Sequence, residues 1–112
     1  MTGHKKTVDH FTQIVNSRHV HHLDQVLEEN VEKIENSKVA FKNIQGAREY
    51  YSMEHEAHPH VQWQILEYEH DDHNTNTLKA KVYYNHHTYN TTYTFAPSGK
   101  IQKIDSQIVS QQ

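Results

Sequence analysis

Residues 54–60, EHEAHPH, contain three histidines and two glutamates in seven positions. Imidazole and carboxylate groups are zinc ligands, and the catalytic motif H-E-x-x-H places two histidines at i and i+4, on one face of a helix. Here His55 and His58 are only three residues apart, and Pro59 disfavours the helical conformation in the residue before it. We therefore interpret this segment as the end of a helix and not as a metal site.

A histidine metal site stays a less favoured hypothesis for this chain. His58 and His60 can share one side of an extended segment, and His70 or His73 in a later turn could supply a third ligand. The twelve histidines are spread over the whole chain, however, which indicates a bias in composition and not a built cluster. We expect neither a bound metal nor a cofactor.

A second combination that could do chemistry is His87 with Asp105, because a histidine and a carboxylate can exchange protons with a substrate. The alternation of a strand places His87 on the same face as Tyr93. Asp105 falls on the face opposite Ile104 and Ile108, which we expect to be buried. The two side chains would therefore meet only if the last strand contained a bulge. They are our candidate catalytic residues.

The side chains best suited to line an apolar pocket are aromatic. The chain has seven Tyr, three Phe and one Trp. A tyrosine hydroxyl in an apolar cavity needs a hydrogen-bond partner, so a core tyrosine can also become a binding residue. The predicted ligand-binding residues are Tyr51, Trp63, Tyr83, Tyr84, Tyr93 and Phe95.

Helices in the first half of the chain are expected to position these side chains. Apolar residues recur at helical spacing from about Thr7 to Val15, over residues 20–27, and from Gly46 to about residue 58. Asp9 would lie in the first turn of the first helix, where a carboxylate suits the helix dipole.

Strands are expected in the remainder of the chain. Two short extended segments separate the second and third helices, at 31–35 and 39–44. Four longer segments alternate as strands do and are joined by turn residues: 61–70, 78–84, 87–95 and 101–109. Residues 110–112 are expected to fray. This order predicts one α+β domain over residues 1–112, with three helices packed on a strongly bent antiparallel sheet.

Composition argues against several classes of protein. The chain has no cysteine, which excludes disulfides, thiolate catalysis and thiolate zinc sites. No apolar run approaches the roughly 20 residues of a membrane span, and the N-terminus does not resemble a signal peptide. The net charge is −3 and the basic residues are scattered, which argues against nucleic-acid binding. We expect a soluble cytoplasmic protein without nucleic-acid or membrane partners.

Four segments carry a resemblance to a known family: HLDQVLEENVEKIE (22–35), NIQGAREYYSM (43–53), HPHV (58–61) and FAPSGKIQKI (95–104). In this order they resemble the nuclear transport factor 2 superfamily, and within it the SnoaL-like and ketosteroid-isomerase-like proteins. The resemblance covers about Val8 to Val109. It implies a cone-shaped barrel around an apolar pocket and a homodimer formed through the sheet. It does not imply a reaction, because this fold hosts many activities.

A ketosteroid isomerase uses an aspartate base and an oxyanion hole made of a tyrosine and a protonated acid. In the resemblance, the base position falls at Lys33, the acid near Thr91 and the tyrosine near Phe11. All three groups are therefore missing, and we reject ketosteroid isomerase activity.

Our leading hypothesis is a small-molecule pocket protein for an apolar or aromatic ligand. Its chemistry could be that of a lyase, isomerase or cyclase, with His87 or Asp105 as base and Tyr51 or Tyr93 as hydrogen-bond donor. The alternative is a non-catalytic ligand-binding or dimerisation module whose own tyrosines fill the cavity. A cavity below about 300 Å³ would favour this alternative. Whether the chain is an enzyme stays open.

Overall fold

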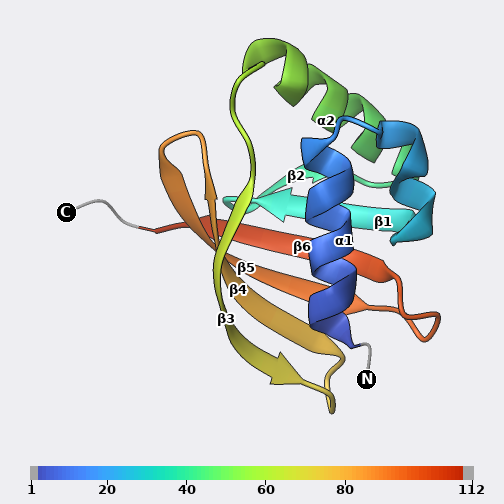
Figure 1. The fold of residues 1–112 in the computed structure, drawn as a ribbon. Coiled ribbons are helices and arrows are strands. Elements are labelled where there is room, and N and C mark those ends of the chain that lie inside the picture. The colour runs from blue at the N-terminus through green and yellow to red at the C-terminus, as the bar shows by residue number, and fades with distance from the viewer. Residues whose placement is uncertain (1–2, 110–112) are drawn as a thin grey trace.

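Two α-helices and one 3₁₀-helix lie on the concave face of a six-stranded sheet (Figure 1). The structure is a computed structural model that describes residues 3–109; residues 110–112, for which we predicted fraying, lie outside that range. The elements are α1 (His4–Asn16), the 3₁₀-helix η1 (Val20–Gln25), β1 (Leu27–Glu35), β2 (Lys38–Phe41), α2 (Ile44–Ala57), β3 (Gln64–Asp72), β4 (Thr77–Tyr84), β5 (His87–Phe95) and β6 (Ile101–Ile108).

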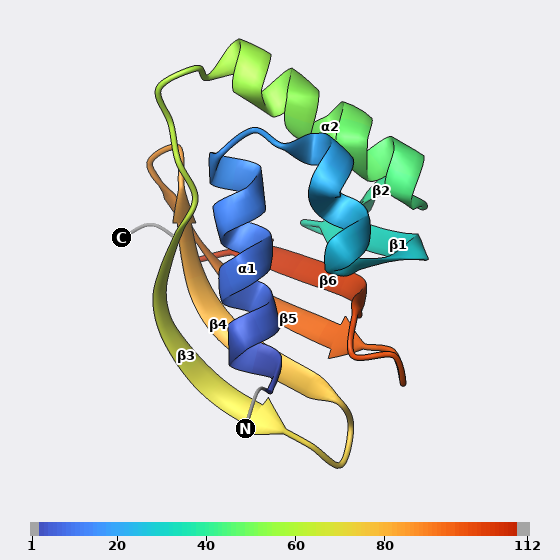
Figure 2. The same ribbon diagram turned by 45° about the vertical axis from the view of Figure 1, so that its right-hand side comes forward.

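The sheet has the strand order β2-β1-β6-β5-β4-β3, so that β2 and β3 are its edges and it does not close. Its strands curl around α1 (Figure 2). Neighbouring strands are antiparallel except β1 and β6, which are parallel. A parallel pair needs a long connection, and here β2, α2 and the strands β3 to β5 lie between β1 and β6 along the chain. The α+β class and the bent sheet are confirmed, and the parallel pair is the one departure from the predicted pairing.

The core lies between the helices and the concave face of the sheet. Alternation along the strands brings one set of side chains inward, where the apolar face of α1 meets them. Its buried members from α1, β4, β5 and β6 are Val8, Phe11, Ile14, Val15, Leu78, Ala80, Val82, Tyr93, Phe95, Ile101 and Ile104. Ile108 was expected in this set but is 41% exposed, because the end of β6 projects beyond the helices (Figure 1).

Helix α1 begins earlier than its apolar periodicity indicates. It starts at His4, where we predicted about Thr7, so Asp9 is not in its first turn and that expectation was wrong. The additional turn is polar and carries no apolar repeat. It is held by packing, because the His4 ring stacks on the ring of Phe95 with a centroid distance of 3.9 Å.

Strand β3 begins at Gln64, whereas we predicted a strand from residue 61. The reason is that the Asn16 side chain, at the end of α1, binds both backbone groups of Trp63. Asn16 Nδ2 donates to the Trp63 carbonyl at 2.8 Å, and the Trp63 N–H donates to Asn16 Oδ1 at 2.8 Å. The Asn16 side chain thus bonds the backbone groups of Trp63 that a neighbouring strand would otherwise bond.

Helix α2 starts two residues before the predicted Gly46, because Asn43 caps it: Asn43 Oδ1 accepts from the Gly46 N–H at 2.7 Å. A β-carbon on Gly46 would lie 3.0 Å from the β-carbon of Phe41, so glycine permits the close approach of α2 to β2. The helix ends at Ala57 and His58 leaves it, which confirms that residues 54–60 are a helix end.

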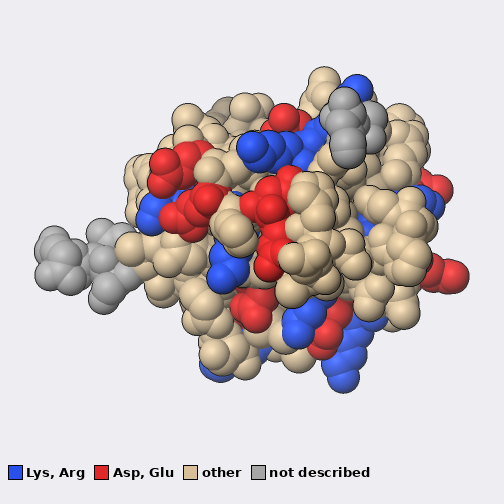
Figure 3. All heavy atoms as spheres, turned by 90° about the horizontal axis from the view of Figure 1, so that it is seen from below, with Lys and Arg blue, Asp and Glu red and all other residues tan. Residues whose placement is uncertain are grey.

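The surface is mixed in charge where Figure 3 shows it. Lysine and arginine side chains lie among aspartates and glutamates on that face and do not join into one basic surface. Within residues 3–109, no helix combines the length and the apolar character that crossing a membrane requires.

The Asn16 bridge can be tested by substitution. Asn16→Ala removes two hydrogen bonds and leaves the Trp63 backbone groups without partners, so we expect the free energy of unfolding to fall by about 2 kcal/mol. Urea denaturation followed by the fluorescence of Trp63, the only tryptophan, measures this. Gln62→Ala, at an exposed neighbouring position, is the matched control and should change stability by less than about 0.5 kcal/mol. Equal stabilities of the two variants would contradict the proposed role of Asn16.

Candidate functional site

A pocket lies between α1, α2 and the concave face of the sheet. Its lining is mostly apolar and aromatic, with a few polar groups: Phe11, Thr12, Val15, Lys33, Glu35, Tyr51, Trp63, Val82, Tyr89, Thr91, Tyr93, Ile104 and Ser106. The free space inside is about 30 Å³, which is room for only one or two water molecules. A larger ligand must therefore displace side chains.

Lys33 is the basic residue of this lining. It is only 3% exposed, because the alternation of β1 turns Val31, Lys33 and Glu35 toward the helices. Its Nζ lies 4.9 Å from the ring centroid of Trp63 and 5.5 Å from that of Tyr51. A cation at these distances is attracted by the faces of the rings.

Burial decides the proton affinity of this amine. Loss of hydration disfavours the ammonium form and lowers the pKa of Lys33 from 10.5 to about 8, although the carboxylates of Glu35 and Glu54 oppose the shift. The Glu35 Oε1 atom is 3.9 Å from Nζ, beyond hydrogen-bond distance. Lys33 therefore loses its proton near pH 8, well below the pH at which an exposed lysine does, and the neutral amine can act as a base.

Two tyrosines outside the lining hold the carboxylates that face this amine. The Tyr50 hydroxyl donates to Glu35 Oε1 at 2.7 Å, and the Tyr84 hydroxyl donates to Glu54 Oε1 at 2.9 Å. Burial, followed by the neighbouring Tyr51 and the hydrogen bond to Glu35, raises the pKa of Tyr50, and burial with the hydrogen bond to Glu54 raises the pKa of Tyr84. These hydroxyls therefore stay protonated and fix the two carboxylates in place. Glu54 belongs to the segment EHEAHPH, which thus contributes a charge to the site.

The pocket also contains hydrogen-bond donors. Burial raises the pKa of both Tyr51 and Tyr93, so their hydroxyls remain protonated. The indole N–H of Trp63 is buried and has no hydrogen-bond partner within the described part of the chain. A buried donor without a partner is unusual in a folded protein. It is suited to a ligand that carries a carbonyl or carboxylate oxygen.

Half of the six predicted ligand-binding residues line the pocket: Tyr51, Trp63 and Tyr93. Tyr84 is buried behind the lining and stacks on Trp63 with a centroid distance of 3.6 Å. Tyr83 alternates to the other face of β4 and is 36% exposed. Phe95 is on the predicted inner face but stacks on His4, outside the pocket lining.

The predicted pair of His87 and Asp105 does not form. Asp105 pairs with Thr92 across β5 and β6, and Thr92 points to the face opposite His87 and Tyr93. Asp105 instead lines a surface depression with Lys79 and Lys81. The bulge that would have turned Asp105 inward does not occur, because β6 keeps regular pairing with β5 from Lys103 to Ile108.

The three positions that the family resemblance assigned to ketosteroid isomerase chemistry, Phe11, Lys33 and Thr91, all line the pocket. Lys33 is not among the site residues predicted from the sequence, where it marks only the position of a missing base. The signal was present: Lys33 lies between Val31 and Glu35 on one face of a strand and occupies the inferred base position. Thr91 forms a buried hydrogen bond with Ser106 at 3.1 Å.

Comparison with solved structures identifies the fold. No family model and no curated protein matches the sequence. Solved structures do match. A SnoaL-like polyketide cyclase from Agrobacterium tumefaciens has a TM-score of 0.79 at 14% identity, covering 98% of this chain and 94% of that chain. An NTF2-like protein of unknown function from Exiguobacterium has a TM-score of 0.76 at 12% identity, covering 94% and 99%.

A third match is SalBIII, an epoxide hydrolase/cyclase-like enzyme with a role in pyran ring formation in polyether salinomycin. Its TM-score is 0.78 at 17% identity, covering 95% of this chain and 90% of that chain. At such identities the likeness concerns the fold. The chain thus has the SnoaL-like, NTF2-like fold that the resemblance implied, while the homodimer stays a prediction.

The buried amine predicts that the free energy of unfolding depends on pH in an unusual way. Lys33→Met removes a group that binds a proton less readily in the folded chain than in the unfolded chain. Below about pH 8 both states are protonated and the burial penalty is complete, so the variant should be more stable by about 3 kcal/mol. Between about pH 8 and 10.5 the unfolded chain binds more protons, and wild-type stability should rise relative to the variant.

Urea denaturation of both proteins at pH 7 and pH 10 tests this expectation. The tyrosines titrate in both proteins, so their contribution cancels in the difference. A stability difference that is the same at the two pH values would show that Lys33 is not a buried, destabilising cation.

Proposed function

We propose that this chain is a small-molecule enzyme of the lyase, isomerase or cyclase type, in which Lys33 transfers protons for an apolar or aromatic carbonyl compound. The observation that carries the proposal is the burial of the Lys33 amine in an aromatic pocket beside tyrosine and tryptophan donors. A buried lysine with a lowered pKa is costly for a fold and is a common feature of catalytic sites.

The groups in the pocket suit proton removal beside a carbonyl. The neutral Lys33 amine would take a proton from the carbon next to the carbonyl, and the electron pair would move onto the carbonyl oxygen. Tyr51, Tyr93 or the Trp63 indole could donate a hydrogen bond to this oxygen as it becomes negative. Return of the proton to another carbon is isomerisation, loss of a leaving group is a lyase reaction, and attack within the substrate is cyclisation.

The structural neighbours support this range of chemistry without selecting within it. One is named as a polyketide cyclase and another as an epoxide hydrolase/cyclase-like enzyme. Both share the fold with this chain at low identity. Because function on a common fold depends on the site, the proposal rests on Lys33 and its neighbours.

A second candidate function is a non-catalytic binding or dimerisation module. The free space of about 30 Å³ favours it, since it is far below the roughly 300 Å³ of a usual ligand pocket. On this alternative the aromatic side chains fill the cavity themselves, and Lys33 stays buried without a substrate. If the chain is an enzyme, its substrate must be small or must displace pocket side chains.

Hydrogen–deuterium exchange at carbon tests catalysis before the substrate is known. Acetophenone and cyclohexanone are incubated in D₂O with the protein, and loss of the proton next to the carbonyl is followed by NMR. We expect exchange at least tenfold faster with wild type than with Lys33→Met. Lys81→Met, a surface control paired with Glu69, should match wild type.

The same samples separate the two candidate functions. Quenching of Trp63 fluorescence reports ligand in the pocket independently of chemistry. Quenching without exchange would support a binding module, and neither signal would support a cavity filled by its own side chains. Equal exchange in wild type and Lys33→Met would refute Lys33 as the base.

The exchange rate should also depend on pH in a defined direction. Only the neutral amine can accept a proton, so the rate should rise with pH and level off above about 8, where Lys33 loses its proton. A rate that falls over the range from pH 7 to 9 would require a protonated group in the rate-limiting step and would contradict this role.

A further inference from the structure

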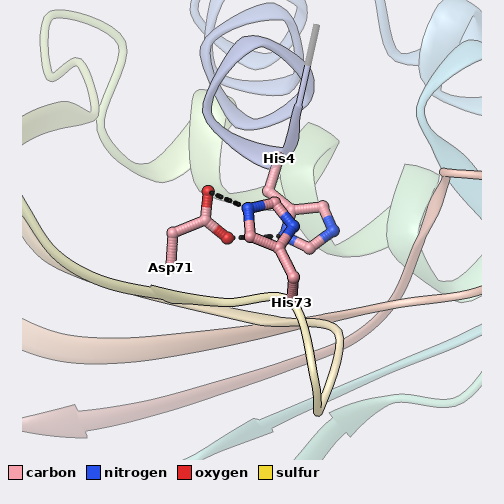
Figure 4. A group of neighbouring side chains, drawn as sticks. All are labelled: His4, Asp71 and His73. Atoms are coloured by element: carbon pink, nitrogen blue, oxygen red, sulfur yellow. Dashed lines mark hydrogen bonds and ion pairs between the residues drawn. The ribbon is translucent and has the colours of Figure 1, made fainter. Parts of the chain in front are cut away.

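His4, Asp71 and His73 come together although they lie far apart along the chain (Figure 4). His4 is the first residue of α1, Asp71 is near the end of β3, and His73 is in the turn that follows. None of the three lines the Lys33 pocket. We propose that these residues form a binding site for one Zn²⁺ ion, with a water molecule as the fourth ligand.

The distances fit a single small ion. His4 Nδ1 is 2.9 Å from Asp71 Oδ1, and His73 Nε2 is 3.6 Å from Asp71 Oδ2. One ligand atom from each residue lies within 4.8 Å of the other two. Ligands of a tetrahedral zinc at about 2.0–2.2 Å are about 3.3–3.6 Å from each other, so only small side-chain movements are needed to enclose the ion.

Two of the ligands are held in place by the fold. The His4 ring stacks on Phe95 at an interplanar angle of 6°, and its side chain is only 14% exposed. Asp71 is in a strand and half-buried. His73, which is 66% exposed, stacks loosely on His4 at a centroid distance of 5.2 Å. A preformed pair with one adjustable ligand, open to solvent, can admit an ion from solution.

The ligand types select the kind of ion. Two imidazole nitrogens and one carboxylate oxygen are a common ligand set for zinc, whereas calcium and magnesium prefer oxygen ligands throughout. The nearest further pair on the hairpin, His70 with Asp72 at 3.9 Å, provides a local control. Within residues 3–109, His4, Asp71 and His73 are the one group of three metal-ligating side chains that converge in this way.

Such an ion would join α1 to the β3–β4 hairpin. The predicted consequence is measurable without any knowledge of the reaction. Protein purified without a metal column or histidine tag is treated with a chelator and titrated with ZnCl₂ at pH 7.5. We expect one Zn²⁺ ion to bind per chain with micromolar or tighter affinity. Zinc should raise the melting temperature by several degrees, and EDTA should reverse this increase.

His73→Ala is the main variant, because this exposed turn residue can be replaced without loss of the fold, as circular dichroism will check. We expect it to weaken zinc binding at least tenfold, and Asp71→Asn to do the same. His70→Ala on the same hairpin, and His58→Ala with His60→Ala in EHEAHPH, should bind as wild type does.

Cobalt gives an independent measurement. Co²⁺ in a four-coordinate site absorbs strongly in the visible range, and this absorption should appear in wild type and be lost in His73→Ala. No binding at 100 µM ZnCl₂, or an affinity that His73→Ala leaves unchanged, would overturn the proposal. Loss of zinc binding in the His58→Ala, His60→Ala double variant, with binding retained in His73→Ala, would also overturn the proposal. It would place the ion at the end of α2.

Discussion

Burial of the Lys33 amine among aromatic rings is the interaction on which the candidate site depends. Removal of an ammonium group from water is unfavourable, and a cation at this place must be compensated by its surroundings. The compensation comes from the ring faces of Tyr51 and Trp63 and from the carboxylates of Glu35 and Glu54. It is incomplete, which is why the amine gives up its proton more easily than an exposed lysine would.

This arrangement needs the whole curved sheet. Lys33 comes from β1, Trp63 from the segment before β3, and Tyr93 from β5. They converge because the sheet bends around α1 and because Asn16, at the end of that helix, holds the backbone of Trp63. The pairing of β1 with β6 brings Lys33 beside Ile104 in the middle of the sheet. Flattening of the sheet would expose the amine and remove its unusual proton affinity.

Helix α1 connects the pocket with the proposed zinc site. Its first residue, His4, is a proposed metal ligand, and Phe11, two turns later, lines the pocket. An ion at the first turn would restrain this helix against the β3–β4 hairpin at a distance from the amine. The two proposals are nevertheless independent, because neither uses a residue of the other.

Local sequence patterns indicated the order of elements, the inward face of β5, the helix end at Pro59 and three of the pocket aromatics, but they did not separate Tyr83 from Tyr84 on β4. These follow from periodicity and turn residues, which are local properties. Three features depend on the packing of distant segments: Lys33 is buried, Asp105 faces away from the pocket, and β1 pairs with β6 in parallel. The same holds for the pairing of His4 with Asp71, which are 67 residues apart. The environment of a charged side chain is set by distant segments that pack on it, and the spacing of residues along the chain carries little information about such contacts.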